Sequence, residues 1–173
     1  MIHLLQTFLL AVFPVLVIVA ALKDVTRYTI PNWISLALVA AFPLAALSLH
    51  MPLPVIGMNL AVGAGALVAG MAMFAVGWIG GGDAKLFAAA TLWLGWPALL
   101  TDLAVTGLAG GALAMLLLGL RSTHVRPFVP NGPTWFGRLV EPGENVPYGA
   151  AIAAGALAAF PACALMQGLA PSL

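Results

Sequence analysis

The sequence predicts an all-α polytopic membrane protein: a single transmembrane domain with about six spanning helices and both termini in the periplasm. Composition is the first observation behind this prediction, since 63% of the 173 residues are hydrophobic and only 6% are charged. A soluble domain carries roughly 25% charged residues, so this chain cannot cover itself with a water-facing surface. The second observation is that the apolar residues form long runs, several close to the roughly 20 residues that a spanning helix needs.

Short polar or helix-breaking segments separate the apolar runs and define the predicted boundaries. Pro31-Asn32 closes the first connection, residues 51–54 form the second, and Gly80-Gly81-Gly82 forms the third. The fourth connection is short and is placed near Thr101-Asp102. Pro161 in the last run predicts a kink, or a helix end just before it. The spanning helices are therefore expected over residues 4–22, 33–49, 55–79, 84–100, 103–120 and 147–169.

The basic residues indicate the orientation of the chain, because all six fall in the first, third or fifth connection. Cytoplasmic connections carry an excess of Lys and Arg, so these three connections are expected in the cytoplasm. Residues near Met51 and Leu173 are then periplasmic, and residues near Asn131 are cytoplasmic. The basic residues are Lys23, Arg27, Lys85, Arg121, Arg126 and Arg138.

Two aspartates lie at the cytoplasmic ends of predicted spans. Asp83 follows the glycines Gly80 to Gly82 between two long apolar runs, and Asp24 follows the first run. A carboxylate at the edge of a hydrocarbon phase is costly, which makes it a functional hypothesis by default. The glycines let other backbone approach closely. Asp102 is expected on the opposite side of the membrane, so only Asp24 and Asp83 can meet.

A pair of neighbouring carboxyl groups supports one particular chemistry. Two carboxylates a few ångströms apart do not both ionise readily, so the pair shares a proton. One member then acts as general base on a water while the other donates to a substrate carbonyl. This aspartic-protease arrangement needs neither a metal nor a nucleophilic side chain, and no cofactor is expected. Cys163 is the single cysteine, and the histidines lack metal-ligand spacing; they are His3, His50 and His124.

Each aspartate also has a purely structural interpretation. Asp83 is well placed to cap the N-terminus of the fourth helix. Asp24 stands between Lys23 and Arg27 and could form an ordinary ion pair at the membrane interface. From the single residues alone, the structural and functional interpretations are equally favoured.

Two further features are open to more than one interpretation. Residues 121–146 form the one sizeable polar segment, and its Pro and Gly residues exclude a long helix. An irregular connector is favoured over a lid that contacts substrate. Small residues recur within the predicted spans, where they permit close helix packing. Gly107 and Gly111 form a Gly-x-x-x-Gly pair, Gly63, Gly65 and Gly70 occur in the third run, and Ala151 stands four residues before Gly155. Packing within the bundle is favoured over an interface between two copies.

Taken together, the motifs resemble those of a known family. Gly80-Gly81-Gly82-Asp83 fits the G-x-G-D signature of intramembrane aspartic proteases, and residues 82–86 are similar to its form in type IV prepilin peptidases. Asp24, followed by Ile30-Pro31-Asn32, is similar to the first-aspartate segment of that family. Pro147-Tyr148-Gly149 resembles its C-terminal Pro-aromatic-Gly motif. The three motifs occur in the family's order, and the resemblance covers nearly the whole chain.

The resemblance implies a bacterial inner-membrane endopeptidase that removes the leader of prepilins or pseudopilins at the cytoplasmic face, cleaving after a glycine. Its partners would be the prepilin, the lipid bilayer and the pilus assembly machinery. No nucleic acid is expected, and the net charge of +1 indicates none. The implied catalytic pair is Asp24 and Asp83. Substrate-binding or loop-shaping roles are implied for Gly80, Gly82, Lys85, Pro147, Tyr148 and Gly149.

The sequence departs from the family pattern in two places. Full-length members carry an N-terminal region with paired cysteines and also N-methylate the cleaved pilin. This chain starts almost directly in the first apolar run and has one cysteine. It therefore resembles the short, peptidase-only form associated with tight-adherence (Flp-type) pili, and no methyltransferase activity is expected. Ala150 stands where the family's third motif has a proline, which makes a substrate-lining role for that segment less secure.

Two rival functions account for part of the pattern. A transporter would explain glycine-broken helices and carboxylates at the membrane edge. However, the halves of the chain show no internal repeat, and no ionisable residue lies deep within a predicted span. A non-catalytic subunit of a pilus or secretion assembly is the second rival. It predicts that Asp24 and Asp83 can be exchanged without loss of function.

Overall fold

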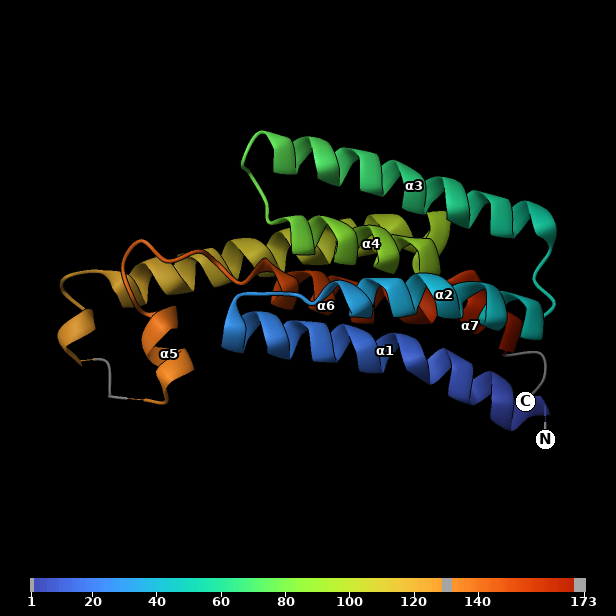
Figure 1. Cartoon of the computed structure of the whole chain (residues 1–173), viewed down its shortest axis with the longest axis horizontal. Helices are drawn as coiled ribbons and strands as arrows, with labels where there is room; N and C mark the ends of the chain where they lie inside the picture. The colour runs from blue at the N-terminus through green and yellow to red at the C-terminus, as the bar shows by residue number, and fades with distance from the viewer. Residues whose placement is uncertain (1, 129–131, 170–173) are drawn as a thin grey trace.

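The computed structural model describes residues 2–128 and 132–169, which form an all-helical bundle without strands (Figure 1). The all-α fold class is therefore confirmed. The elements are α1 (Ile2–Arg27), α2 (Asn32–Ser48), α3 (Leu53–Ala75), α4 (Gly81–Arg121), η1 (Arg126–Phe128), α5 (Thr134–Leu139), α6 (Tyr148–Ala159), η2 (Phe160–Ala162) and α7 (Ala164–Leu169).

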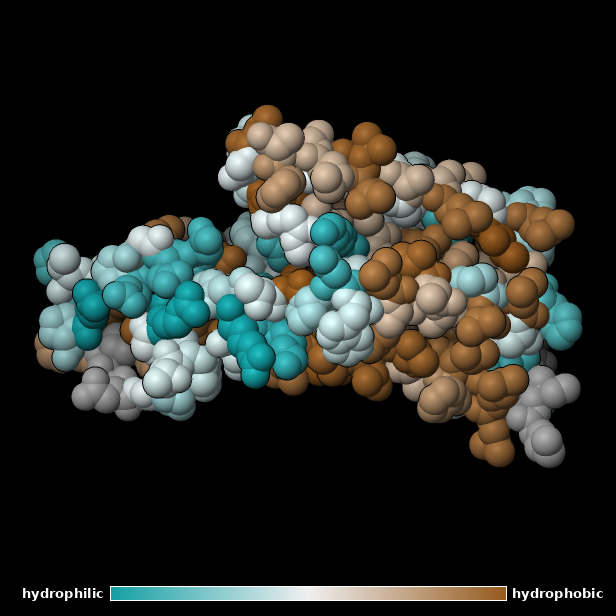
Figure 2. Space-filling model, viewed as in Figure 1, coloured by the Kyte–Doolittle hydropathy of each residue, from teal (hydrophilic) through white to brown (hydrophobic). Residues whose placement is uncertain are grey.

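Within the described residues, four helical segments are long and apolar enough to cross a membrane, namely α1, α3, α4 and the stretch from α6 into α7. Helix α2 is also apolar but has only 17 residues. Hydrophobic side chains cover these helices, whereas hydrophilic residues gather at the end that carries α5 (Figure 2). This distribution is that of a membrane protein. Six spans and periplasmic termini stay predictions, and Asn131 and Leu173 lie outside the described residues.

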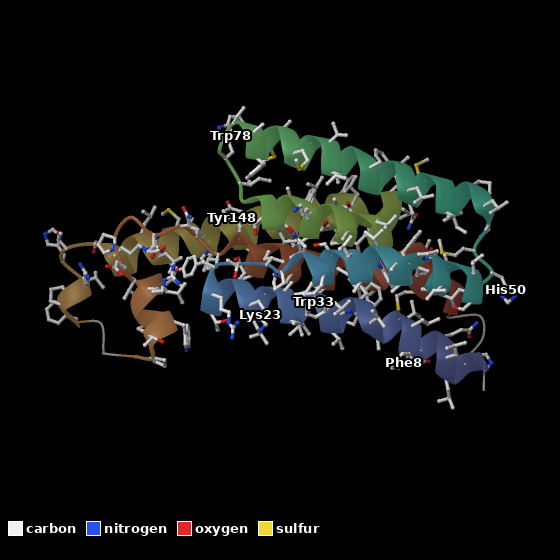
Figure 3. The ribbon with its side chains drawn as sticks, viewed as in Figure 1. Phe8, Lys23, Trp33, His50, Trp78 and Tyr148 are labelled. Atoms are coloured by element: carbon white, nitrogen blue, oxygen red, sulfur yellow. The ribbon has the colours of Figure 1, made fainter. Side chains whose placement is uncertain are left out.

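The connections between the helices lie at the two ends of the bundle, grouped as the sequence predicts. The α1–α2 and α3–α4 connections and the polar segment between α4 and α6 lie toward one end, and the α2–α3 connection lies at the other (Figure 1). Figure 3 shows Lys23, Trp78 and Tyr148 in the half of the molecule that holds the first group of connections, and His50 at the opposite end of the bundle. The basic connections therefore share one end of the bundle, which we call the polar end.

Helix α4 corrects the predicted fourth connection, because its break lies at Gly95 and not near Thr101-Asp102. Gly95 has φ 66° and ψ −174°, a left-handed conformation that a side chain would strain. The halves of α4 run in opposite directions from this point (Figure 1). Hydropathy placed the break at the most polar residues of the run. The actual determinants are a glycine and the nearby Pro97, inside an otherwise apolar stretch.

Asn59 of α3 satisfies backbone groups at this break. Its side-chain nitrogen donates to the carbonyl oxygen of Leu92 at 2.9 Å and contacts that of Trp93 at 3.5 Å, and the residue is only 1% exposed. Carbonyls at a helix end lack intrahelical partners, which is costly in a medium without water. The Asn59 amide occupies the space that a Gly95 side chain would need. The break therefore depends on a matched pair of residues from α3 and α4.

The position of Asp102 differs from the prediction. It lies within the second half of α4, is 0% exposed, and accepts a hydrogen bond from Thr106 at 3.3 Å. Its carboxylate packs against Gly155 of α6. Two expectations are therefore wrong: Asp102 is not in a connection, and an ionisable residue does lie within a long apolar helix.

Close packing is confirmed at some of the glycines singled out in the sequence and is absent at others. The Gly107 and Gly111 positions face open space, so the prediction that this pair packs within the bundle is wrong. Helices α3 and α4 instead approach at Gly63 and Gly70, where an added Cβ would stand 2.9 Å from Leu92 Cβ and 3.0 Å from Ala84 Cβ.

An aromatic cluster holds the centre of the bundle together. The fully buried Trp93 of α4 lies between Phe13 of α1 and Phe42 of α2, at ring-centroid distances of 5.4 and 6.1 Å. Its indole nitrogen donates to the carbonyl of Leu38 at 2.8 Å. The prediction for Pro161 is confirmed, because α6 ends at Ala159 and a short 3₁₀ turn follows.

We expect Asn59→Leu to lower the free energy of unfolding by about 1–3 kcal/mol, because it leaves buried carbonyl groups without donors. Gly95→Ala should be at least as harmful, since it adds a strained φ to a collision with Asn59. Unfolding in detergent micelles, followed by circular dichroism, measures both. Gly107→Ala is the matched control, because its added methyl meets nothing. A similar loss in all three variants would contradict the role given to the Asn59–Gly95 pair.

Candidate active site

Segments far apart in the sequence enclose a cavity of about 400 Å³ at the polar end of the bundle. Asp24 near the end of α1 and Asp83 at the start of α4 both line it. Its other walls are residues 77–80 before α4, residues 145–146 before α6, and Tyr148. An adjoining cavity of about 240 Å³ is lined by the same two aspartates. Both aspartates therefore line the same two cavities, and their action as a catalytic pair stays a prediction.

Asp24 is held by the start of α6. Its Oδ2 accepts a hydrogen bond from the backbone N–H of Gly149 at 2.7 Å, across 125 residues of sequence. The residue is 6% exposed, and no Lys or Arg among the described residues lies within ion-pairing distance of it. The alternative of an ion pair with Lys23 or Arg27 is therefore wrong. Backbone N–H groups at a helix start favour a negative charge, so this contact stabilises the Asp24 carboxylate.

Asp83 occupies the third position of α4 and does not cap the helix. The N-cap is Gly80, which has no side-chain capping hydrogen bond, so the capping alternative is wrong. The Oδ2 of Asp83 lies against Gly80, where an added Cβ would stand 2.8 Å away. The buried Oδ1 has no hydrogen-bond partner within the described part of the chain. One carboxyl oxygen of Asp83 is thus left without a partner in the described part of the chain, in a residue that lines the cavity.

Ile30 joins the three predicted motifs. An added Cβ at Gly82 would lie 3.2 Å from Ile30 Cβ, and one at Gly149 would lie 2.8 Å from Ile30 Cδ1. The isoleucine therefore fits between the starts of α4 and α6 because both positions lack a side chain. Two residues further on, Asn32 accepts a hydrogen bond from Lys85 Nζ at 3.0 Å. These contacts hold the α1–α2 connection against the loop that carries Asp83.

The third motif lines the site through Tyr148. Its ring packs against Gly110 in the second half of α4, where an added Cβ would stand 2.7 Å from the ring. Pro147 is buried and precedes the first residue of α6. Of the predicted substrate-binding or loop-shaping residues, Gly80 and Tyr148 line the larger cavity and Gly82 lines the smaller one. Lys85 lies outside both cavities.

Tyr28 is a site residue that the sequence analysis missed. It lines both cavities, and its hydroxyl is buried without a partner among the described residues. Burial raises the pKa of Tyr28 above its ordinary value, although the neighbouring Arg121 opposes the shift. The phenol therefore stays neutral and can donate a hydrogen bond. Its position directly after the last residue of α1, close in sequence to Asp24, was the available signal.

Arg121 was interpreted only as a topology determinant, but it also fixes one wall of the cavity. At the end of α4 its guanidinium donates to the carbonyl oxygens of Leu139, Glu144 and Asn145, at 2.8, 2.7 and 3.0 Å. These bonds hold the segment that leads into α6. Residues 121–146 contain only short helices in the described part, which confirms the expectation that no long helix forms there.

The arrangement presents two acid groups and a phenol to a partly enclosed polar cavity. Two carboxyl groups that lie within a few ångströms of each other can share a proton and perform acid–base chemistry on a bound water. Within the described residues, no three His, Cys, Asp or Glu side chains gather as a metal site would require.

Comparison with known proteins gives one match. The model of the type IV leader peptidase family matches residues 11–115, a stretch that contains Asp24 and Asp83 and ends before Pro147. No curated protein and no solved structure matches the chain.

We expect Arg121→Gln to release the segment before α6, because charge-assisted hydrogen bonds to three carbonyl groups are lost. Trypsin should then cleave after Arg138 at least about tenfold faster in the detergent-solubilised protein. Arg126→Gln is the control, since Arg126 is exposed and donates to none of these carbonyls. Equal cleavage rates in the two variants would show that Arg121 does not hold the segment.

Proposed function

The chain belongs to the type IV leader peptidase family, and from this premise we propose that it is an aspartic endopeptidase of the bacterial inner membrane. Its substrates are prepilin-like or pseudopilin proteins, and it removes their leader peptides at the cytoplasmic face. The observation that carries the proposal is the shared cavity of Asp24 and Asp83. The family supplies the peptidase activity, and the pair of acids supplies the catalytic type.

The contacts of the two aspartates support different roles for them. Asp24 accepts the N–H of Gly149, a contact that favours the charged form, so we assign it as the general base. Asp83 has an unpartnered Oδ1 and is assigned as the acid that carries the shared proton. In this mechanism Asp24 takes a proton from a water molecule as the water oxygen attacks the scissile carbonyl carbon. Asp83 gives its proton to the carbonyl oxygen, which produces a neutral tetrahedral diol.

The second half of the reaction restores both groups. Asp24 returns its proton to the nitrogen of the leaving amine as the C–N bond breaks. Asp83 recovers a proton from one hydroxyl of the diol, and that oxygen becomes part of the new carboxyl group. Tyr28 lines the same cavity, and we assign its hydroxyl as a hydrogen-bond donor to the oxygen on which charge develops. The proposed reaction uses only atoms of the chain, the substrate and water.

The position of the cavity supports a substrate cut at the membrane boundary. The cavity lies at the polar end, where apolar helices give way to connections that carry the basic residues. A leader that is polar and precedes an apolar helix would present its scissile bond at this level. The excess of basic residues at the same end supports a cytoplasmic location.

The rival functions fit the site less well. The buried Asp102 removes one argument against a transporter, but its hydrogen-bonded neighbour is Thr106 and it lines neither aspartate cavity. Asp102 therefore does not join the two aspartates in a polar pathway of the kind that a transporter would need. A non-catalytic assembly subunit has no need for two acids in one cavity.

We expect Asp24→Asn and Asp83→Asn each to reduce leader removal by roughly 10²- to 10⁴-fold while the protein stays inserted and stable. Asn preserves the size of the side chain but can neither accept the proton of water nor donate as an acid. Because the pair acts as a unit, the double variant should be little worse than either single one. The measurement is the ratio of unprocessed to processed substrate, normalised to the amount of enzyme in the membrane.

Glu141→Gln is the control for this series, because it neutralises an exposed acid at the same end of the molecule. Asp102→Asn is unsuitable as a silent control, since that carboxyl is buried against α6. Normal processing by either single Asn variant would remove that residue from catalysis and favour the assembly subunit.

The proposed orientation predicts opposite behaviour of two reporter fusions. A reporter that is active only in the periplasm should be active after Met51, in the α2–α3 connection. One that is active only in the cytoplasm should be active after Gly143, between α5 and α6. The reason is that the basic connections lie at the end that carries Gly143. A cytoplasmic signal at Met51 would reverse the orientation and place the aspartate cavity on the periplasmic side.

A further inference from the structure

An apolar groove of about 480 Å³ runs between α2, α3 and the first half of α4, outside the aspartate cavities. Leu36 and Val39 of α2 form one side, and Leu60 and Leu67 of α3 form the other. The floor is α4, with Ala88 and Ala89 among its residues. We call this feature the α2–α3 groove, and no part of the mechanism above uses it.

The groove opens sideways toward the membrane. Leu36, at its edge, is 66% exposed, and Val39, Leu60 and Leu67 are also exposed. Helix α3 packs chiefly against α4 and has few contacts with α2. A ligand that is itself embedded in the bilayer could therefore enter the groove without passing through water.

One end of the groove is polar and adjoins the aspartates. Asn32, Ser35 and Lys85 line this end, and the Lys85–Asn32 hydrogen bond of 3.0 Å crosses it from α4 to α2. Lys85 follows Asp83 by two residues, and Ile30, two residues before Asn32, lines the smaller aspartate cavity. A molecule lying along the groove would thus have its polar end beside the candidate catalytic pair.

Ser35 gives the independent sign of a ligand. Ser35 is 6% exposed and lines the groove, and its hydroxyl has no hydrogen-bond partner among the described residues. A buried hydroxyl without a partner is costly, and in a bilayer no bulk water relieves it. A polar group of a bound molecule at this point would relieve the cost.

Small residues shape the interior of the groove for a helix. Gly63 and Ala64 of α3 and Ala88 and Ala89 of α4 line it. Small side chains let the backbone of a second helix approach closely, which is the main source of helix affinity within lipid. An acyl chain would gain little from such a floor and would leave Ser35 unpartnered.

We propose that the α2–α3 groove binds the apolar helix of the substrate, which follows the cleaved bond, with the helix N-terminus at Ser35. The proposal rests on the proposed function, because that function supplies a substrate made of a polar leader and an apolar helix. The first turn of any helix has N–H and side-chain groups free of intrahelical bonds, and these can pair with the Ser35 hydroxyl. The residues just before the helix then reach Asp24 and Asp83.

The other flank of α3 provides a natural comparison. A second apolar cavity of about 450 Å³ lies there, lined by Ala61, Ala66, Phe87 and Trp96 among others. Its lining contains no charged side chain and neither of the aspartates. It has a similar size but no polar end, so it is assigned no substrate.

The first test fills each cavity with a phenylalanine. The probe is a synthetic substrate in detergent micelles, with a short polar leader that ends in glycine and an apolar helix of about 20 residues. Ala64→Phe should raise KM for this probe roughly tenfold, because the helix loses contacts worth about that factor, and should leave kcat close to that of the unaltered enzyme. Ala61→Phe, in the second cavity, should change neither constant. Equal effects of the two variants, or an unchanged KM in Ala64→Phe, would overturn the proposal.

A second test does not depend on activity or on the stability of a phenylalanine variant. Leu67→Cys in the groove and its neighbour Val68→Cys, which lines none of the cavities described above, are compared in the Asp83→Asn protein. The native Cys163 is fully buried and contributes little background. With dissolved oxygen and a copper catalyst added as the oxidant, a probe with a cysteine in its apolar helix should form a disulfide with Leu67→Cys at least about fivefold faster than with Val68→Cys. Equal rates would overturn the groove as the binding site.

The two tests separate the groove from the chemistry. If the unaltered enzyme does not cleave the probe, the proposed function fails, and the cross-linking comparison still decides whether the groove holds the helix. If cleavage occurs and cross-linking shows no preference, the proposed function stands and only the groove is wrong.

Discussion

The hydrogen bond between the Gly149 N–H and the Asp24 carboxylate, 2.7 Å long, is the contact on which the rest of the site depends. It joins the end of α1 to the start of α6, and Ile30 fills the space beside it. The same isoleucine lies against Gly82, which brings the start of α4 and Asp83 into the arrangement. Three segments that are distant in the sequence therefore meet because glycines leave room for one aliphatic side chain and one carboxylate.

The bilayer imposes a second constraint, because irregular backbone must be satisfied by protein groups. Asn59 does this at the break of α4, where it donates to carbonyl oxygens next to Gly95. Arg121 does the same at the polar end, where it holds three carbonyl oxygens of the segment before α6. Each of these polar side chains thus supplies hydrogen bonds that the backbone of an irregular segment lacks. Each segment in turn positions helices that contribute to the cavity or the groove.

The α2–α3 groove is apolar along most of its length, and its polar end lies near the residues of the aspartate cavities in the sequence. Lys85 and Asn32 are joined by a hydrogen bond at this end. Lys85 was expected to shape the catalytic loop or bind substrate, and it lines the polar end of the groove that we propose as the binding site of the substrate helix. A substrate that is part lipid-embedded helix and part polar leader matches this change from apolar to polar in its own chemistry.

The sequence by itself determined the membrane class, the all-α fold, the grouping of the basic connections and the two aspartates of the site. Composition, run length and local motifs carry that information, because each depends on neighbouring residues alone. Only the tertiary structure decided that α4 reverses at Gly95, that Asp102 is buried against Gly155, and that Tyr28, Asn59 and Arg121 serve the site or its framework. In an apolar run hydropathy is nearly uniform, so it cannot show where a helix breaks. That position depends on which distant side chain supplies the missing hydrogen bonds.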